Sequence, residues 1–216
     1  MKKLLVLLLV VVSSITFVGC KNKKDLINIG ILQYLEHNAL TEARLGFIER
    51  LAEEGYVDKE NINITILNPE TDASTMALQA RELVRKSDLL FAIATPAASA
   101  LVNEAKQQGK NTPILFTAVT DPVDAKLIQS NENPGGNVTG TNDMNPITLQ
   151  ISLVKTLVPN AQKLGIIYTS GESNSELQAD LAKTEAEKLG LEVTINTIAS
   201  VNDLKQVAGQ LALNVD

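Results

Sequence analysis

The regular alternation of strand-like and helix-like segments constrains the fold of this chain more than any other feature. The predicted strands are residues 26–32, 62–67, 89–94, 113–118, 137–141, 163–169 and 191–198. The predicted helices are residues 40–54, 73–86, 97–108, 146–157, 173–189 and 201–213, with a short helix after Asp121 and Pro122 that reaches Ser130. Strands that alternate with helices predict an α/β fold, with parallel sheets covered by helices on both faces.

The same alternation predicts two lobes. Residues 89–94 (LLFAIA) are apolar throughout, as is typical of a central parallel strand covered on both faces. The pattern restarts at Lys163, so we predict one lobe over residues 26–142 and a second over 143–216, joined between residues 141 and 146. The second lobe has only two predicted strands, and a two-stranded sheet is barely stable alone. We therefore expect that this lobe is incomplete and that the natural protein continues past Asp216.

Composition excludes several classes of function. The formal net charge of −6 disfavours binding to a phosphate backbone, so we expect no nucleic-acid partner. Cys20 and His37 are the only residues of their types, which leaves no internal disulfide and almost nothing for a zinc site or a histidine-based triad. We accordingly predict no metal and no cofactor.

The first twenty residues have the pattern of a secretory signal, with two lysines followed by a short apolar run. They resemble a bacterial lipoprotein signal that is cut before Cys20, although Phe17 stands where such signals usually have leucine. The resemblance implies a signal peptide over residues 1–19, a diacylglycerol on Cys20, a tether over residues 20–25 and an extracytoplasmic protein anchored to the bacterial membrane by lipid. More than one acyl chain is needed for firm anchoring. The alternative is an uncut signal anchor in which Cys20 has no role.

Polar residues follow several predicted strands, and ligands of open α/β sheets bind outside the carboxyl ends of the strands. Each of these turns leads into a helix whose free N–H groups suit a small anion. The candidate residues are Gln33, His37, Thr95, Pro96, Ala97, Thr120, Asp121, Glu172, Asn174 and Ser175.

Each candidate also has a purely structural interpretation. His37, Asp121 and the polar residues from Ser173 to Ser175 are types that cap helices or form turns. Thr95 and Pro96 are suited to starting a helix, and Glu172 is consistent with a solvated carboxylate. No phosphate-binding glycine motif and no Gly-x-Ser-x-Gly motif follows a strand, so the sequence indicates no catalytic group.

Several segments in order resemble the substrate-binding lipoproteins of bacterial ABC importers, in the family that includes tryptophan and tyrosine binders. They are GILQYLEHNALTEARLGFIERLAEEGY, ATPAASAL, PILFTAVTDPVDAKLI, NPGGNVTGTND and GIIYTSGESNSELQ. The resemblance implies two Rossmann-like lobes of the type I periplasmic-binding fold in a family whose members are longer than this chain. It implies that the candidate residues face an interlobe cleft, which binds a small solute such as an amino acid. The partners implied are an ABC permease and its ATPase.

An aromatic ligand would require an aromatic or apolar wall, for which Tyr34, Phe116 and Tyr168 are the candidates. Two other functions of the same fold stay open. A ligand-sensing ectodomain of a signalling receptor predicts a later transmembrane segment. A secreted hydrolase requires a nucleophile and a base, and His37 is the only histidine available as that base.

Overall fold

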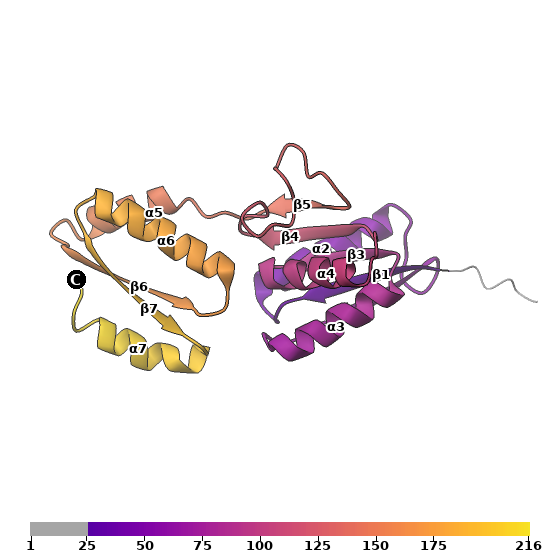
Figure 1. The fold of residues 1–216 in the computed structure, drawn as a ribbon, viewed down its shortest axis with the longest axis horizontal. Coiled ribbons are helices and arrows are strands. Elements are labelled where there is room, and N and C mark those ends of the chain that lie inside the picture. Colours follow the sequence, from indigo (N-terminus) through magenta and orange to yellow (C-terminus); the bar gives the residue numbers. More distant parts are fainter. Residues whose placement is uncertain (1–25) are drawn as a thin grey trace, which may run out of the picture.

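The computed structural model describes residues 26–216 and folds them into two α/β lobes (Figure 1). The first lobe holds a five-stranded parallel sheet in the order β2-β1-β3-β4-β5. Its strands are β1 (Ile27–Gln33), β2 (Ile62–Leu67), β3 (Leu89–Ile93), β4 (Ile114–Val119) and β5 (Val138–Asn142). The second lobe holds a two-stranded parallel sheet of β6 (Lys163–Thr169) and β7 (Glu192–Ile198). The predicted α/β fold is confirmed, whereas the predicted signal peptide, the tether and Cys20 lie outside the described residues.

Alternate residues of the central strands pack on opposite faces of the first sheet. Ile29 and Ile31 of β1 pack on one face with Phe91 and Ile93 of β3. That face is covered by α2 (Asn38–Glu53), whose Phe47 stacks on Phe91 with ring centroids 4.1 Å apart. Side chains of a strand alternate between the two faces, so the next residues along each strand point the other way.

The opposite face of the first sheet carries the larger core. There α3 (Ala73–Lys86) and α4 (Thr95–Gln107) pack on Leu32, Leu90 and Ala92 through apolar residues that include Leu83 and Leu101. Because helices cover both faces of the sheet, every side chain of β3 packs against a core, which explains its uninterrupted apolar sequence.

The second lobe is smaller but follows the same plan. Helices α5 (Ile147–Leu157) and α6 (Ser173–Lys188) build a core around Ile151, Ala161, Ala186 and Leu191. A 3-10 turn, η1 (Val201–Asp203), leads into α7 (Leu204–Leu211), which lies on the other side of the sheet (Figure 1). There Leu211 packs so closely on Gly165 of β6 that a Cβ atom at this glycine would clash.

One predicted helix is absent. The chain after Asp121 and Pro122 makes a single hydrogen-bonded turn in place of the predicted helix to Ser130. Lys126 has a φ of 58°, which is left-handed and ends any helix at that point. Within residues 26–216, none of the helices combines the length and apolar character that crossing a bilayer requires.

The sheets point their carboxyl ends toward each other across the space between the lobes (Figure 1). We call the surfaces formed by these strand ends and the helix starts that follow them the interlobe face. A hydrogen bond of 3.1 Å from the Tyr34 hydroxyl to Glu172 Oε1 joins the two lobes there. The fold thus brings the ends of β1 and β6 together although the two residues are 138 positions apart in sequence.

Candidate functional site

Helix starts on the interlobe face differ in how their free N–H groups are satisfied. At α2 and α3, the side chains of His37 and Asp72 accept hydrogen bonds from the first turn. At α4 and α6, the residues at the cap positions, Ala94 and Glu172, make no such hydrogen bond. An uncapped helix start keeps N–H donors and positive potential for another partner.

The start of α4 is buried and tied to the neighbouring strand end. Thr95 is 2% exposed, and its Oγ1 accepts a 3.3 Å hydrogen bond from the backbone N–H of Thr120. Pro96 occupies the first turn, where a missing N–H costs nothing. Ala97 is fully buried, so its methyl group packs in the core of the first lobe. These four candidates form one compact group at the ends of β3 and β4.

Two alanines in this region have a backbone conformation that normally requires glycine. Ala94, which ends β3, has φ 85° and ψ 154°. Ala118, near the end of β4, has φ 54° and lies where the pairing of β4 with β5 shifts register. Such residues cost about 1–3 kcal/mol each and concentrate at binding sites. Sequence reasoning missed both, because an alanine carries no signal of its φ angle.

Gln33 is enclosed by protein partners. Its side chain is buried, and its Oε1 accepts a 2.7 Å hydrogen bond from Arg44 Nε. Its Nε2 donates to the carbonyl of Leu35 at 2.9 Å and to Thr41 Oγ1 at 3.2 Å. The Thr41 hydroxyl also donates to Glu36 at 2.7 Å. Gln33 therefore orders the turn between β1 and α2, with its polar atoms already occupied.

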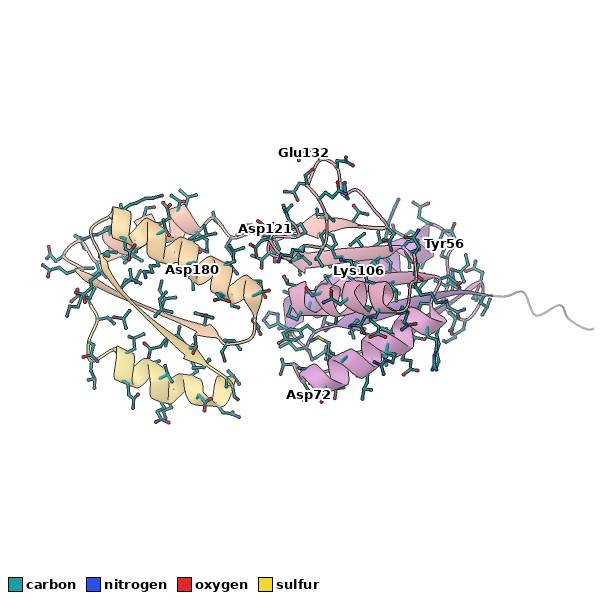
Figure 2. All side chains as sticks on the ribbon, viewed as in Figure 1. Tyr56, Asp72, Lys106, Asp121, Glu132 and Asp180 are labelled. Atoms are coloured by element: carbon teal, nitrogen blue, oxygen red, sulfur yellow. The ribbon has the colours of Figure 1, made fainter. Side chains whose placement is uncertain are left out.

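His37 and Asp121 both satisfy local backbone groups. His37 Nδ1 accepts a 3.3 Å hydrogen bond from Ala39 N–H at the start of α2. Asp121 Oδ1 accepts from the N–H groups of Val123 and Asp124 at 2.9 and 3.0 Å. Asp121 lies on the side of the first lobe nearest the second (Figure 2). The structural interpretation of each residue therefore accounts for its observed contacts.

Glu172 connects the two lobes and the start of α6. It is half-buried, with Oε1 accepting from Tyr34 of the first lobe and Oε2 accepting from Ser175 Oγ at 2.9 Å. Burial, followed by the charge and the hydrogen bond of Glu172, raises the pKa of Tyr34 to about 12. Tyr34 thus stays protonated and able to donate at any physiological pH.

Asn174 has an unsatisfied polar atom in the first turn of α6. Its Oδ1 is buried and has no hydrogen-bond partner among the described residues. A buried acceptor without a partner costs about 1–3 kcal/mol, so it is suited to a donor from a ligand. The sequence suggested Asn174 as a cap or a ligand contact, and only the structure distinguishes its free oxygen.

The three aromatic candidates lie in different surroundings. Phe116 is buried in the core of the first lobe, whereas Tyr34 and Tyr168 are half-buried. Within residues 26–216, no group of three His, Cys, Asp or Glu side chains is arranged to hold a metal ion.

The fold and the interlobe face define an open α/β binding module, and comparison with known proteins gives its family. The family model for ABC transporter substrate binding proteins matches residues 28–216. This chain belongs to that family.

Three relatives are informative. A tyrosine-binding protein from Clostridioides difficile is 42% identical over 190 residues, which are 88% of this chain and 54% of that protein. The ABC domain from Streptococcus pneumonia in complex with L-Trp is 38% identical, with a TM-score of 0.80 over 88% of this chain and 63% of that one. The ligand-free, open structure of a substrate-binding protein with adhesive properties from Clostridium difficile has the same identity and coverage but a TM-score of 0.60. This chain therefore spans between 54% and 63% of the length of these relatives.

Proposed function

We propose that this chain is the ligand-binding part of an extracytoplasmic substrate-binding protein that captures an aromatic amino acid between its lobes. One observation supports this most strongly. At equal identity and coverage, the chain resembles the L-Trp complex more closely than the ligand-free open structure, with TM-scores of 0.80 and 0.60. The arrangement of its lobes is thus similar to that of a relative holding an aromatic amino acid.

The polar groups of the interlobe face suit the two charged ends of an amino acid. We assign the carboxylate to the uncapped start of α4, whose first turn begins at Thr95. The free Oδ1 of Asn174 accepts from the ammonium group. Tyr34 and Tyr168 offer ring surface for an aromatic side chain. Gln33, His37 and Asp121 hold the surrounding turns, and Glu172 and Ser175 order the start of α6.

We assign the hydrogen bond between Tyr34 and Glu172 to the closed arrangement, because it joins the two lobes. A ligand shifts the lobes toward that arrangement only by its preference for the closed state. An interlobe hydrogen bond stabilises the closed state relative to the open state by about 0.5–1.5 kcal/mol. The ligand does not have to supply this part of the free energy of closure.

The anchoring and the partners belong to the same proposal. Cys20 follows a signal-like segment and carries the lipid, so the lobes work outside the cell beside the membrane. The solute passes to an ABC permease that is driven by its ATPase. Replacing Cys20 with Ala should abolish labelling by a radioactive fatty acid, and unchanged labelling would exclude this anchor.

Asn174→Leu tests the ligand site directly. We expect calorimetric titration of the purified protein with L-tryptophan and L-tyrosine to show binding, and the substitution to raise the Kd about tenfold or more, as expected for loss of a hydrogen bond to a charged group. The ligand-free variant should unfold at the same temperature as the parent or higher, because an unsatisfied buried acceptor has been removed.

Asn214→Leu is the matched control, since Asn214 is exposed after α7, near the start of β6 and away from the interlobe face. It should leave the affinity unchanged. Unaltered affinity in Asn174→Leu would remove this residue from the site, and no heat signal with either amino acid would overturn the proposed ligand class.

A further inference from the structure

A second pocket lies at the opposite end of the first lobe from the interlobe face. It has a volume of about 410 Å³ and is formed by the end of α4, the first residues of β4 and β5, and the segment between these strands. Ile114 and Val138, which begin β4 and β5, lie in its wall. Because the strands are parallel, this is the edge at which β1 also begins, and it is remote from the carboxyl ends.

The pocket is lined by positive charge alone. Its charged residues are Lys106, Lys110 and Lys126, all exposed, and no aspartate or glutamate is in its lining. None of the three forms an ion pair with another described residue. We call this feature the lysine pocket.

The walls of the lysine pocket combine an apolar floor with an open rim. Val102, Ile114, Leu127 and Val138 are buried side chains in its lining. Gly135 and Gly136 are exposed on the rim, and Gly135 has φ 79° with Gln129 where a Cβ atom would be. A larger residue at Gly135 would press on Gln129. The combination suits a ligand that has an anionic head and an apolar base.

The position of the lysine pocket relative to the start of the lobe indicates where such a ligand is found. Cys20 is seven residues before Ile27, and that length of chain spans at most about 25 Å. β5 is three strand positions from β1, which corresponds to about 15 Å. If Cys20 is held at the bilayer, the lysine pocket is therefore within reach of the head groups.

We infer that the lysine pocket binds the phosphate head group of an anionic phospholipid and so fixes the first lobe against the membrane. This inference rests on the proposed lipid anchor, but not on the proposed ligand. The lysines contact the phosphate, and the apolar floor contacts the glycerol and the first acyl carbons. With this end held, the interlobe face points away from the point of attachment and stays free for solute.

Lysine footprinting on the full chain tests the inference. The protein is purified in detergent and reconstituted into vesicles of phosphatidylcholine, or of phosphatidylcholine and phosphatidylglycerol at a ratio of 3:1. An amine-reactive acetylating reagent is added, and modification of each lysine is followed by mass spectrometry. We expect Lys106, Lys110 and Lys126 to react about fivefold more slowly in the anionic vesicles, since one basic residue near such a surface contributes about that factor.

Lys183, Lys188 and Lys205, which are exposed in the second lobe, provide the internal control and should react equally in both vesicles. Protein that floats with the vesicles but shows no selective protection overturns the inference while leaving the anchor intact. Protein that does not float with the vesicles on a density gradient indicates that the lipid anchor is absent. Footprinting with added anionic vesicles then tests the lysine pocket alone.

Two further arms identify the source of the anion and the role of the cluster. Equal protection by glycerol phosphate in detergent, without anionic lipid, would show a site for soluble anions and overturn the assignment to lipid.

In the Lys126→Gln protein, Lys106 and Lys110 should lose most of their protection. Lys205→Gln, which removes the same charge from the second lobe, should leave that protection unchanged. Equal effects of both substitutions would indicate a general charge effect and contradict a defined site.

Discussion

Two residues with ordinary side chains and unusual backbones mark the end of the first sheet. Ala94 and Ala118 hold positive φ angles of 85° and 54° beside the uncapped start of α4. Neither conformation is needed to continue a strand or a helix. The strain is consistent with a chain that places backbone N–H groups in a set direction for a ligand.

Ala94→Gly should stabilise the protein and weaken ligand binding. Glycine adopts φ 85° without steric cost, so the substitution relieves backbone strain in the folded state. This relief exceeds the stability lost through the added entropy of the unfolded chain, so the free energy of unfolding should rise by about 0.5–1 kcal/mol. Urea denaturation gives that value, and calorimetric titration gives the affinity. Ala97→Gly is the control, because Ala97 is buried inside α4 and its replacement should destabilise the protein by about 1 kcal/mol. Loss of stability in Ala94→Gly would argue against a strained backbone.

Tyr34 should give the protein a pH dependence in the alkaline range. Its pKa is raised to about 12, above the ordinary value of 10.0, by burial and then by Glu172. The stabilisation linked to its proton is therefore complete below pH 10 and is lost as the pH rises toward 12. Absorbance at the tyrosinate band should show a late component that Tyr34→Phe removes and that Glu172→Gln shifts to lower pH. Tyr56→Phe, at an exposed position remote from the second lobe, should leave that component in place (Figure 2).

At the scale of elements, the helix starts separate into capped and uncapped groups. Asp72 begins α3 at the end of the first lobe that faces the second lobe (Figure 2), and its Oδ1 accepts 2.7 Å hydrogen bonds from Thr75 N–H and Ser74 Oγ. Hydrogen bonds from Thr75 and Ser74 hold the pKa of Asp72 at about 2, below its usual 3.8. This helix start is saturated by its own residues, in contrast to those of α4 and α6.

Asp72→Ala should lower the melting temperature at neutral pH, because the first turn of α3 loses its acceptor. The folded-state pKa is depressed, so the contribution of this carboxylate is present above about pH 4 and is lost as the pH falls toward 2. Melting curves of the parent and the variant should therefore converge over that range. Asp180→Ala, on the exposed face of α6, should change the melting temperature little. A difference for Asp72→Ala that persists at pH 2 would contradict charge-dependent capping.

Whether a segment is a helix or a strand was predictable from sequence, because the spacing of apolar residues and the Gly and Pro residues that end an element are local signals. The bounds of β2, β6 and α3 were predicted as they are found. The helix after Pro122 was wrong, since composition does not reveal the left-handed Lys126 that ends the turn. The strand order was not predicted, as it depends on pairings between segments far apart in the chain.

The sequence predicted where in the fold the candidate residues lie, but not their contacts. Residues after parallel strands fall at one edge of a sheet whatever their roles, and that placed all ten candidates. Their roles depend on partners elsewhere in the chain. Gln33 is enclosed by Arg44, and Glu172 is matched to Tyr34 across the two lobes. Such distant contacts leave no pattern in a single sequence.

At the scale of the whole molecule, the first lobe has two ends with different chemistry. The carboxyl end of its sheet carries the strained alanines, the uncapped α4 and the contact to Glu172. The amino end carries the lysine pocket, at the edge where β1 also begins. On this account one end faces the solute and the second lobe, while the other faces the membrane.

A crystal structure of the purified protein grown with L-tryptophan tests the central claim most directly. We predict that the amino acid lies between the lobes, with its carboxylate within hydrogen-bond distance of the backbone N–H groups at the start of α4 and its ammonium group on Asn174 Oδ1. Tryptophan bound elsewhere, or an empty interlobe face in protein that binds tryptophan in solution, would contradict the account.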